Sequence, residues 1–589
     1  MADSTVSSTV SSTIASLTQS LYQQPSITFT GLGSGVDTSS MIDKLVQAES
    51  GQITKLTAWK SEWTAKISAL QTLNSKLSDL RTTIQGMDTL AGFQGKTASI
   101  SDASVLTATT SATAASGSHQ VVVNRLAQNE VQVQLGLAAA DTVVNGSGAN
   151  QVFAFSYAGG ASVSISVPNG TTLSGLAQLI NASGANPGVT ATVLDMGASY
   201  TTDRYRLMLT GQDTGAANTI TVDDGLTTLN GSGGTANFTS TGFENPPPQQ
   251  AQDAQVRLDG YPPGGWIERA SNTLADLIPG VTLSLLKPSA TAVQVTVADD
   301  TGAMQDKITT LVNQYNDLVS YIREQTKYDK STGEAGVLFG NYGLQIVKSQ
   351  LNAIATGNAP GFADPQDPYL NLAQIGITTD SDETSATFGQ LVVNEGVLSA
   401  ALQADSQGVS NLMASYFAGV SDDTSGNISY LSALPGITQP GTYQVVATVA
   451  GGVLTGGTIN GNPATVGGDT LTGASGYPEY GLGIRVNLTD GTHTGTVRLK
   501  LGVNGQLSEK MDDLLSASSG PVNILINNYQ DIVGNIDDKI ALEQRRVEAY
   551  RQRLTQQFTQ LEAVLSQLND QSNYLTSQIA KLGSFGSRG

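Results

Sequence analysis

Histidine and cysteine are the side chains that most often hold metals or carry acid–base chemistry, and this chain has few of them. Its 589 residues include two histidines and no cysteine. His119 and His493 lie far apart, in segments with a strand-like pattern, and two imidazoles without thiols do not make a metal site. A serine nucleophile of the hydrolase type would need a G-x-S-x-G turn, and the sequence has none. We therefore expect a protein that is not an enzyme.

Clustered carboxylates are the second possible source of chemistry. Asp380, Asp382 and Glu383 form one acidic group, and Asp299 and Asp300 form another. Neither group has the spacing of a calcium loop, so we interpret both as solvated turns. No pair of carboxylates stands out for glycoside cleavage. The sequence predicts no metal and no cofactor.

A glycine-rich segment, residues 31–35 (GLGSG), superficially resembles a loop that cradles phosphate. The third glycine of the dinucleotide motif is out of place, and no strand–helix–strand unit follows. We interpret the segment as a leader into a helix. Asp37 or one of residues 38–40 would cap that helix, and Asp43 is spaced for a capping box with Ser40.

The strongest patterns in the chain are two apolar heptads, one near each end. Leucine recurs every seventh residue from Leu554 to Leu582, and a matching register runs from Leu56 to Ile84. An apolar period of 3.5 keeps one seam facing a partner helix. We expect the two regions to meet and to drive assembly, with Trp59 and Trp63 as seam residues rather than a ligand platform. The predicted contact residues are Leu56, Trp63, Leu70, Leu77, Leu554, Phe558, Leu561, Leu565, Leu568, Leu575, Ile579 and Leu582.

After Gly92 the apolar period becomes two, which is typical of strands. Strands are expected over 120–123, 131–135, 162–167, 189–194, 204–209, 219–222, 256–258, 281–285, 293–297, 443–446 and 497–501, with a short helix over 173–180. A helical pattern covers 304–328, and a last helix without Pro or Gly covers 535–582, with Gly583 placed as its C-terminal cap. The glycine-rich flanks of the second strand-rich block, 419–426 and 502–505, suit hinges.

This order of helix, strands, helix, strands and helix predicts an α+β multidomain protein with β-rich blocks inserted into a helical stalk. We expect a disordered segment at 1–26, coiled-coil-like terminal helices at 27–55 and 540–589, and a helical domain at 56–92, 303–425 and 506–539. One β-rich domain should comprise 93–135 and 251–302, a second at 136–250 should be nested in it, and a third should be inserted at 426–505.

Composition excludes some partners. The formal net charge is −20 and no basic stripe appears, which argues against nucleic acid. No run of residues approaches the length of a membrane span, and residues 1–25 lack the basic and apolar regions of a cleavable signal peptide. If the protein leaves the cell, we expect export by a route that reads a disordered N-terminus.

Several motifs, in order along the chain, resemble those of the bacterial flagellar filament-capping proteins, the hook-associated protein 2 family. They are the leader at 31–37 (GLGSGVD), the central signature at 270–283 (ASNTLADLIPGVTL), the following helix at 312–318 (VNQYNDL) and the C-terminal motif at 571–575 (QSNYL). Residues 159–222 resemble the insertion repeat of flagellar axial proteins, whereas 426–505 looks like an addition to the family's plan.

The resemblance implies a homo-oligomeric plate of about five subunits at the distal tip of the filament, with closed symmetry. Helical legs would reach into the filament end and β-rich head domains would form the plate. The partners implied are flagellin, the hook–filament junction proteins and an export chaperone for the C-terminal helix. The cap would be secreted, would retain exported flagellin while it folds and inserts, and would serve filament elongation and motility. Adhesion is an implied secondary role. Flagellin itself, a hook–filament junction protein and a surface adhesin are the alternatives.

Overall fold

The computed structural model describes residues 37–329, 332–382 and 384–585, without the side chains of 581–585. The expectations for residues 1–36, for Glu383 and for the side chain of Leu582 lie outside this description. The described residues fall into two units. The first comprises 37–79, most of 317–350 and 510–585, and the second comprises 80–316 and most of 351–509. The mixture of long helices with several antiparallel sheets confirms the expected α+β multidomain class.

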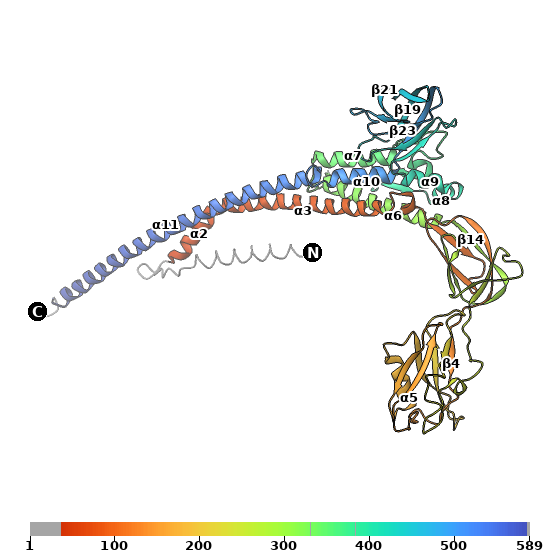
Figure 1. The fold of residues 1–589 in the computed structure, drawn as a ribbon. Coiled ribbons are helices and arrows are strands. Elements are labelled where there is room, and N and C mark those ends of the chain that lie inside the picture. Colours follow the sequence, from red (N-terminus) through yellow and green to blue (C-terminus); the bar gives the residue numbers. More distant parts are fainter. Residues whose placement is uncertain (1–36, 330–331, 383, 586–589) are drawn as a thin grey trace. The chain divides into compact units, whose positions relative to one another are not determined.

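The first unit contains the long helices α3 (Gly51–Gln85) and α11 (Pro521–Phe585) and the shorter helix α2 (Thr38–Glu49). In Figure 1, α2 and α3 both run beside α11. Asp37 caps α2 by accepting a hydrogen bond from the backbone N–H of Ser40 at 3.0 Å, as one of the expected caps. The expected role for Asp43 in a capping box is wrong, because its carboxylate pairs with Arg551 at 2.8 Å.

The last helix is longer than the sequence pattern predicted. It begins at Pro521, where the missing N–H costs nothing in the first turn, it contains Gly534, and it continues past Gly583. The expected start at 535 and the cap at 583 are therefore wrong. The expected domain boundaries at 55/56 and 539/540 fall inside α3 and α11, each of which is one continuous helix.

Two further helices are α6 (Thr301–Thr326) and α7 (Tyr342–Thr356). In the first unit the C-terminal half of α6 packs against α3: the Tyr321 hydroxyl donates to the Ala69 carbonyl at 2.8 Å, and Lys76 pairs with Asp317 at 2.5 Å. The other α-helices among the described residues are α4 (Leu90–Phe93), α5 (Leu173–Ala182), α8 (Glu395–Ala404), α9 (Ser406–Ala414) and α10 (Val503–Leu515).

Two antiparallel sheets share one core in the second unit. Their orders are β1-β14-β3-β10-β11 and β12-β13-β2. The strands are β1 (Lys96–Ile100), β2 (Leu106–Thr110), β3 (Gly117–Arg125), β10 (Ala254–Leu258), β11 (Ile267–Arg269), β12 (Thr273–Ile278), β13 (Val281–Leu285) and β14 (Ser289–Asp299). Inward side chains such as Val121, Val256, Leu283 and Val295 fill the space between the sheets. Strands from before 136 and from after 250 thus pair directly, as β3 does with β10.

The block between these strands has its own core. Its sheets have the orders β4-β8-β7 and β6-β5-β9, and α5 packs against β7. The strands are β4 (Val131–Val133), β5 (Gln151–Tyr157), β6 (Val163–Val167), β7 (Val189–Asp195), β8 (Tyr205–Gly211) and β9 (Ile220–Val222). Phe153, Phe155 and Phe238 are fully buried at its centre. The two chain crossings into the block run side by side, joined by bridges from Gln128 to Gln252 and from Val131 to Gln249.

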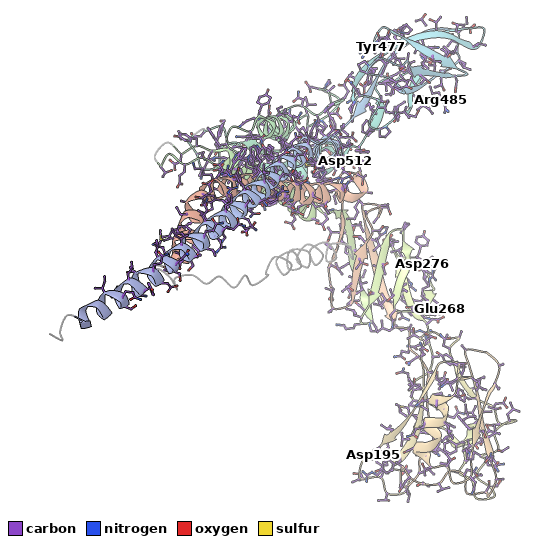
Figure 2. The ribbon with its side chains drawn as sticks, turned by 90° about the vertical axis from the view of Figure 1, so that its left-hand side faces the viewer. Asp195, Glu268, Asp276, Tyr477, Arg485 and Asp512 are labelled. Atoms are coloured by element: carbon purple, nitrogen blue, oxygen red, sulfur yellow. The ribbon has the colours of Figure 1, made fainter. Side chains whose placement is uncertain are left out.

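An eight-stranded antiparallel sheet forms the third β-rich part, in the order β17-β24-β19-β20-β21-β22-β23-β18. Its strands are β17 (Ala418–Ser421), β18 (Ile428–Ser432), β19 (Gly441–Ala450), β20 (Val453–Ile459), β21 (Asn462–Gly467), β22 (Thr470–Gly473), β23 (Gly483–Val486) and β24 (Gly491–Lys500). Tyr443, Val445, Ala447, Val497 and Leu499 lie in its core. Figure 2 labels Tyr477 and Arg485 on this part of the chain. A separate two-stranded sheet pairs β15 (Ile377–Thr379) with β16 (Leu391–Val393).

The flanks of this sheet are packed rather than hinged, so the expected hinges are wrong. Residues 418–421 form β17, and a side chain at Gly419 would come within 2.1 Å of the Tyr430 ring. At the other flank the Gly502 N–H donates to Ser415 at 2.7 Å, and the buried Asn504 donates to the Met87 carbonyl at 2.7 Å. Glycine serves close approach here, which its composition alone does not distinguish from flexibility.

A buried ionic cluster also holds β24 against the loop before β15. Arg498 donates to both carboxylate oxygens of Asp422, at 2.7 and 2.8 Å, and also binds Asp367. Lys500 pairs with the other oxygen of Asp367 at 2.5 Å. Arg498, Asp367 and Lys500 are all buried. Two cations and two carboxylates compensate one another, as burial of charge requires.

Candidate functional site

The candidate site is the seam between the terminal helices, which is completely buried in its middle part. Leu70 and Leu77 of α3 have no exposed surface. Closer to the start of α3, Trp63 meets Tyr529 of α11 edge to face, with the ring centroids 4.9 Å apart. The antiparallel register is fixed on either side of this contact by Lys60 with Asp537 at 2.6 Å and by Asn74 with Asn523 at 3.1 Å. α3 therefore pairs with the beginning of α11. The sequence pattern had predicted that α3 pairs with the heptad that starts at Leu554.

The part of α11 that faces α3 was not among the predicted contact residues. Its seam positions alternate by four and three residues through Tyr529, Val533, Ile536, Ile540, Glu543 and Val547. Ile536 is 1% exposed and Val547 is 9% exposed. The 4-3 spacing is a usable signal, because it places these positions on one face of a helix. The apolar pattern of this face is weakened by Glu543, which occupies a seam position, and by Gly534, which lies next to one.

The shorter helix α2 continues the pairing along α11. Glu49 accepts from Arg546 and Asp43 accepts from Arg551, each at 2.8 Å. Ile42 is buried on the inner face of α2. Leu554 is the last predicted seam residue of α11 that is buried in the described structure.

Beyond Leu554 the apolar stripe continues but becomes exposed. Phe558 and Leu565 are half-buried. Leu561 and Leu568 are 49% and 55% exposed, and Leu575 and Ile579 are 59% and 68% exposed. In Figure 1 none of the other described elements of the first unit lies beside this end of α11. Single exposed leucines are ordinary, whereas a periodic stripe of them is a continuous apolar surface along one helix. We call residues 555–580 the distal stripe.

The histidines have structural surroundings. His119 Nδ1 lies 2.8 Å from Asp259 Oδ2, and this hydrogen bond holds the pKa of the Asp259 carboxyl below its usual range. His493 Nε2 lies 2.7 Å from the Thr489 carbonyl within the same hairpin. Among the described residues, no three His, Cys, Asp or Glu side chains gather as metal ligands would.

The two acidic groups form local hydrogen bonds and ion pairs. Asp300 caps α6 by accepting from the Ala303 N–H at 2.9 Å, and Asp299 binds Lys96 and Ser406. Asp380 and Asp382 accept from Thr387 and Thr384 in the turn before β16. Each acidic group thus stabilises a turn or a helix start.

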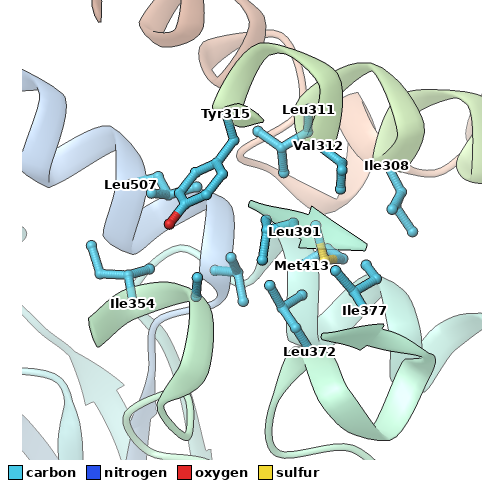
Figure 3. Close-up of a pocket in the computed structure, with 12 residues that line it drawn as sticks. Ile308, Leu311, Val312, Tyr315, Ile354, Leu372, Ile377, Leu391, Met413 and Leu507 are labelled. Carbon is cyan, nitrogen blue, oxygen red and sulfur yellow. The ribbon is translucent and has the colours of Figure 1, made fainter. Parts of the chain in front are cut away.

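One enclosed cavity lies in the helical part of the second unit (Figure 3). Its volume of about 10 Å³ is close to the minimum for one water molecule. Its lining is apolar, from residues such as Leu311, Leu391 and Met413, apart from Tyr315. Burial raises the pKa of Tyr315 to about 12. We interpret the cavity as a packing gap, because it has neither the size nor the polar groups of a ligand site.

None of the helices in the described parts of the chain has a stretch long and apolar enough to cross a membrane.

Comparison with known families gives matches over most of the chain. The family described as flagellar hook-associated protein 2 C-terminus matches residues 251–570, a span that contains the eight-stranded sheet. The corresponding N-terminus family matches residues 34–130. The flagellin hook IN motif matches residues 152–213, which confirms the insertion repeat expected near 159–222.

Individual relatives agree with the family matches. The flagellar hook-associated protein 2 of Escherichia coli K12 is 29% identical over 410 residues, which cover 66% of this chain and 80% of that protein. The B-type flagellar hook-associated protein 2 of Pseudomonas aeruginosa is 27% identical over 413 residues, with the same two coverages. Among solved structures, the D1-D2-D3 domains of the flagellar cap protein FliD from Escherichia coli align with a TM-score of 0.45 and 28% identity, covering 59% of this chain and 90% of that one.

Proposed function

Because this chain belongs to the flagellar hook-associated protein 2 family and is therefore a flagellar filament cap protein, we propose that it retains exported flagellin at the filament tip and promotes its folding and insertion. It belongs to the flagellum and is a structural protein, not an enzyme. This family membership favours the cap over flagellin, a junction protein or a free-standing adhesin.

The observation that carries the proposal is the distal stripe. A long helix that is paired up to Leu554 and then presents Leu561, Leu568, Leu575 and Ile579 to solvent has a surface for assembly. In the proposal the stripe engages neighbouring copies and the filament end, where the copies form a ring of about five subunits with closed symmetry. The junction proteins and flagellin are the proposed flagellar partners. An export chaperone would cover the same stripe before export, which would proceed without a cleavable signal peptide.

The other predicted contact residues have a different role in this proposal. Leu56, Trp63, Leu70 and Leu77 hold α3 against α11 and so keep the distal stripe at a fixed register. The β-rich parts would form the head of the cap, and the helices of the first unit its leg.

A double substitution in the distal stripe tests the function. Leu561→Asp with Leu568→Asp should leave the folded units intact, because both side chains are exposed, but it should abolish filament growth in a cap-deletion strain. Flagellin would then accumulate in the medium while the variant itself is exported. The matched control is Ser566→Asp with Asn573→Asp, two exposed positions on the opposite face of the same helix, which should restore swimming. Normal filaments with the stripe variant would refute the proposal.

Adhesion is proposed as a secondary role of the eight-stranded part. Two of its loops are joined by hydrogen bonds. The Gln439 N–H donates to the Pro478 carbonyl at 2.9 Å, and the Thr438 hydroxyl donates to the Tyr480 carbonyl at 2.8 Å. Ile437, Tyr477 and Tyr480 are 53%, 41% and 41% exposed on these loops, and Figure 2 labels Tyr477. Exposed aromatic and aliphatic side chains in one place are typical of recognition surfaces. Tyr477→Ser with Tyr480→Ser should reduce adherence of motile cells to surfaces without changing filament length.

A further inference from the structure

A groove lies between α3 and α11 near the start of α3, apart from the distal stripe. Its volume is about 470 Å³, and it is lined by Gln52, Lys55, Leu56, Trp59, Lys539, Leu542 and Glu543. Trp59 is 42% exposed and Leu542 is 59% exposed on its two sides. Trp59 belongs to the apolar heptad of α3, so a seam position is left uncovered here.

The same face of α3 is covered further along by another helix of this chain. Leu73 stands two heptads after Trp59 and is fully buried. Lys76 stands three heptads after Lys55 and pairs with Asp317 of α6 at 2.5 Å. The Tyr321 hydroxyl donates to the Ala69 carbonyl, and α6 ends five residues later, at Thr326. The groove therefore continues the line along which α6 packs, beyond the point where α6 stops.

The charge of the groove identifies the kind of occupant. Within the described residues, neither Lys55 nor Lys539 has a carboxylate at ion-pair distance, whereas Lys60 has Asp537 and Lys76 has Asp317. The one carboxylate of the lining, Glu543, pairs with Arg546 at 3.2 Å, so both lysines stay uncompensated beside an exposed tryptophan in a chain of net charge −20. Such a rim attracts carboxylates, and the apolar floor suits one face of a helix.

We propose that this groove binds an acidic amphipathic helix of a partner protein. The helix continues the line of α6, places a carboxylate opposite Lys55 as Asp317 lies opposite Lys76, and covers Trp59 and Leu542 with apolar side chains. This contact is independent of the capping role, since it involves none of the residues of the distal stripe.

The distal stripe is a poor candidate for the same groove. Within one chain, Leu561 lies about 28 Å beyond Leu542 along a single continuous helix, at 1.5 Å per residue, so it cannot fold back. In a second copy the stripe has two carboxylates, Glu562 and Asp570, and Glu562 is buried, so the stripe presents one exposed carboxylate for the two lysines. Charge complementarity thus favours a different, acidic helix.

A peptide of defined chemistry tests the groove in the full-length protein. The probe is a fluorescent, capped 18-residue helix with leucines along one face and glutamates along its edges, and the matched probe has lysine for every glutamate. By fluorescence anisotropy the acidic probe should bind and the basic probe should not. Trp59→Ala should weaken binding of the acidic probe about tenfold, as expected for a central aromatic contact. Ser61→Ala, an exposed position on the opposite face of α3, should leave it unchanged.

A charge reversal makes the test specific. The double variant Lys55→Glu with Lys539→Glu should no longer bind the acidic probe and should bind the basic probe instead. The control, Lys287→Glu with Arg485→Glu, makes the same change in net charge at exposed positions of the second unit and should change neither affinity. An unchanged thermal melt for each variant shows that the helices remain paired. Equal binding of both probes, or no effect of either groove variant, would overturn the proposal.

The absence of cysteine allows one further check. Trp59→Cys creates a single thiol in the groove. If a thiol-to-amine cross-linker joins it efficiently to a second copy, or to residues 1–36 of its own chain, the groove is already occupied by this protein. Either product would overturn the assignment to an acidic partner helix.

Discussion

Trp63 and Tyr529 meet edge to face, although 465 residues of chain lie between them. The contact pairs the middle of α3 with the beginning of α11. The next part of α11 packs against α2, and its last part carries the distal stripe. Aromatic pairs of this geometry contribute stabilisation beyond the area that they bury. The register of the whole helical pair therefore depends on a small number of contacts near this one.

Replacing Tyr529 with alanine should destabilise the first unit by about 2 kcal/mol, because it removes a half-buried aromatic partner of Trp63. Urea denaturation followed by tryptophan fluorescence would measure the loss. Ile524→Ala, on the same helix but at a side chain that is 43% exposed, should cost much less. Equal effects of the two substitutions would show that the aromatic contact does not set the pairing.

Replacing Asp367 with alanine should destabilise the second unit by about 3 to 5 kcal/mol, because Arg498 and Lys500 would remain buried with one carboxylate between them. The control is Asp469→Ala, which removes the exposed pair with Arg485 at 3.3 Å and should cost less than about 1 kcal/mol. Arg485 is labelled in Figure 2. Differential scanning calorimetry would separate the two outcomes.

Replacing Gly419 with alanine should destabilise the eight-stranded sheet by about 1 to 3 kcal/mol, because the added methyl group would overlap the Tyr430 ring. Gly467→Ala adds the same group in a strand with open space around it, and it should be neutral or slightly stabilising. Thermal unfolding of the two variants provides the comparison. A neutral Gly419→Ala would show that the Tyr430 ring can move away.

Two buried tyrosines should make the protein sensitive to alkali. Burial raises the pKa of Tyr315 to about 12, and burial together with the Glu479 carboxylate raises the pKa of Tyr443 to about 12. In an unfolded chain the tyrosine pKa is about 10. Between these values the folded state binds more protons, so the stabilisation is complete below about pH 10 and is lost as the pH rises toward 12. Tyr315→Phe should flatten this decline in a pH series of denaturation curves, whereas Tyr328→Phe, at a half-exposed side chain, should not.

Most of the eight-stranded part should be removable without loss of capping. The Asp422 N–H donates to the Thr496 carbonyl at 2.9 Å, so the ends of a deletion of residues 424–495 are adjacent and a Gly-Ser bridge can join them. This deletion keeps Asp422, Arg498 and Lys500, and with them the ionic cluster. Motility and filament length should be unchanged. A deletion of residues 418–500 would remove Arg498 and Lys500 and leave the Asp367 carboxylate without its cationic partners, so it should reduce the expression of folded protein.

The sequence predicted the elements whose signal is local and periodic. The helices containing Leu56–Ile84 and Leu554–Leu582, the helix over 173–180 and strands such as 281–285 are all present, because their burial follows a fixed period along the chain. The strand Gln151–Tyr157 was missed because its side chains are covered on both faces, which removes the alternation that a half-buried strand shows.

Tertiary partners decided the remaining differences. Asp43 has the spacing for a capping box, but Arg551 of α11 binds its carboxylate instead. The flanks of the third β-rich part contain glycine and serine, which are typical of hinges and equally of tightly packed turns. Leu77 and Leu568 occupy equivalent heptad positions, yet one is fully buried and the other is 55% exposed. No local pattern distinguishes them, because burial depends on which helix lies opposite.

The pairing of α3 with α11 also constrains the order in which the chain can fold. Closing a flexible loop of more than 400 residues costs about 5 kcal/mol of chain entropy, before any helical contact forms. The strands between them pair over shorter separations, so their closure is cheaper and faster. Once they have folded, the two helices are tied together by compact bodies instead of by open chain. We expect the stalk to be the last part to form. A chain that ends before residue 521 should retain its β-rich parts, while α2 and α3 lose α11 as their partner and α3 keeps its contact with α6.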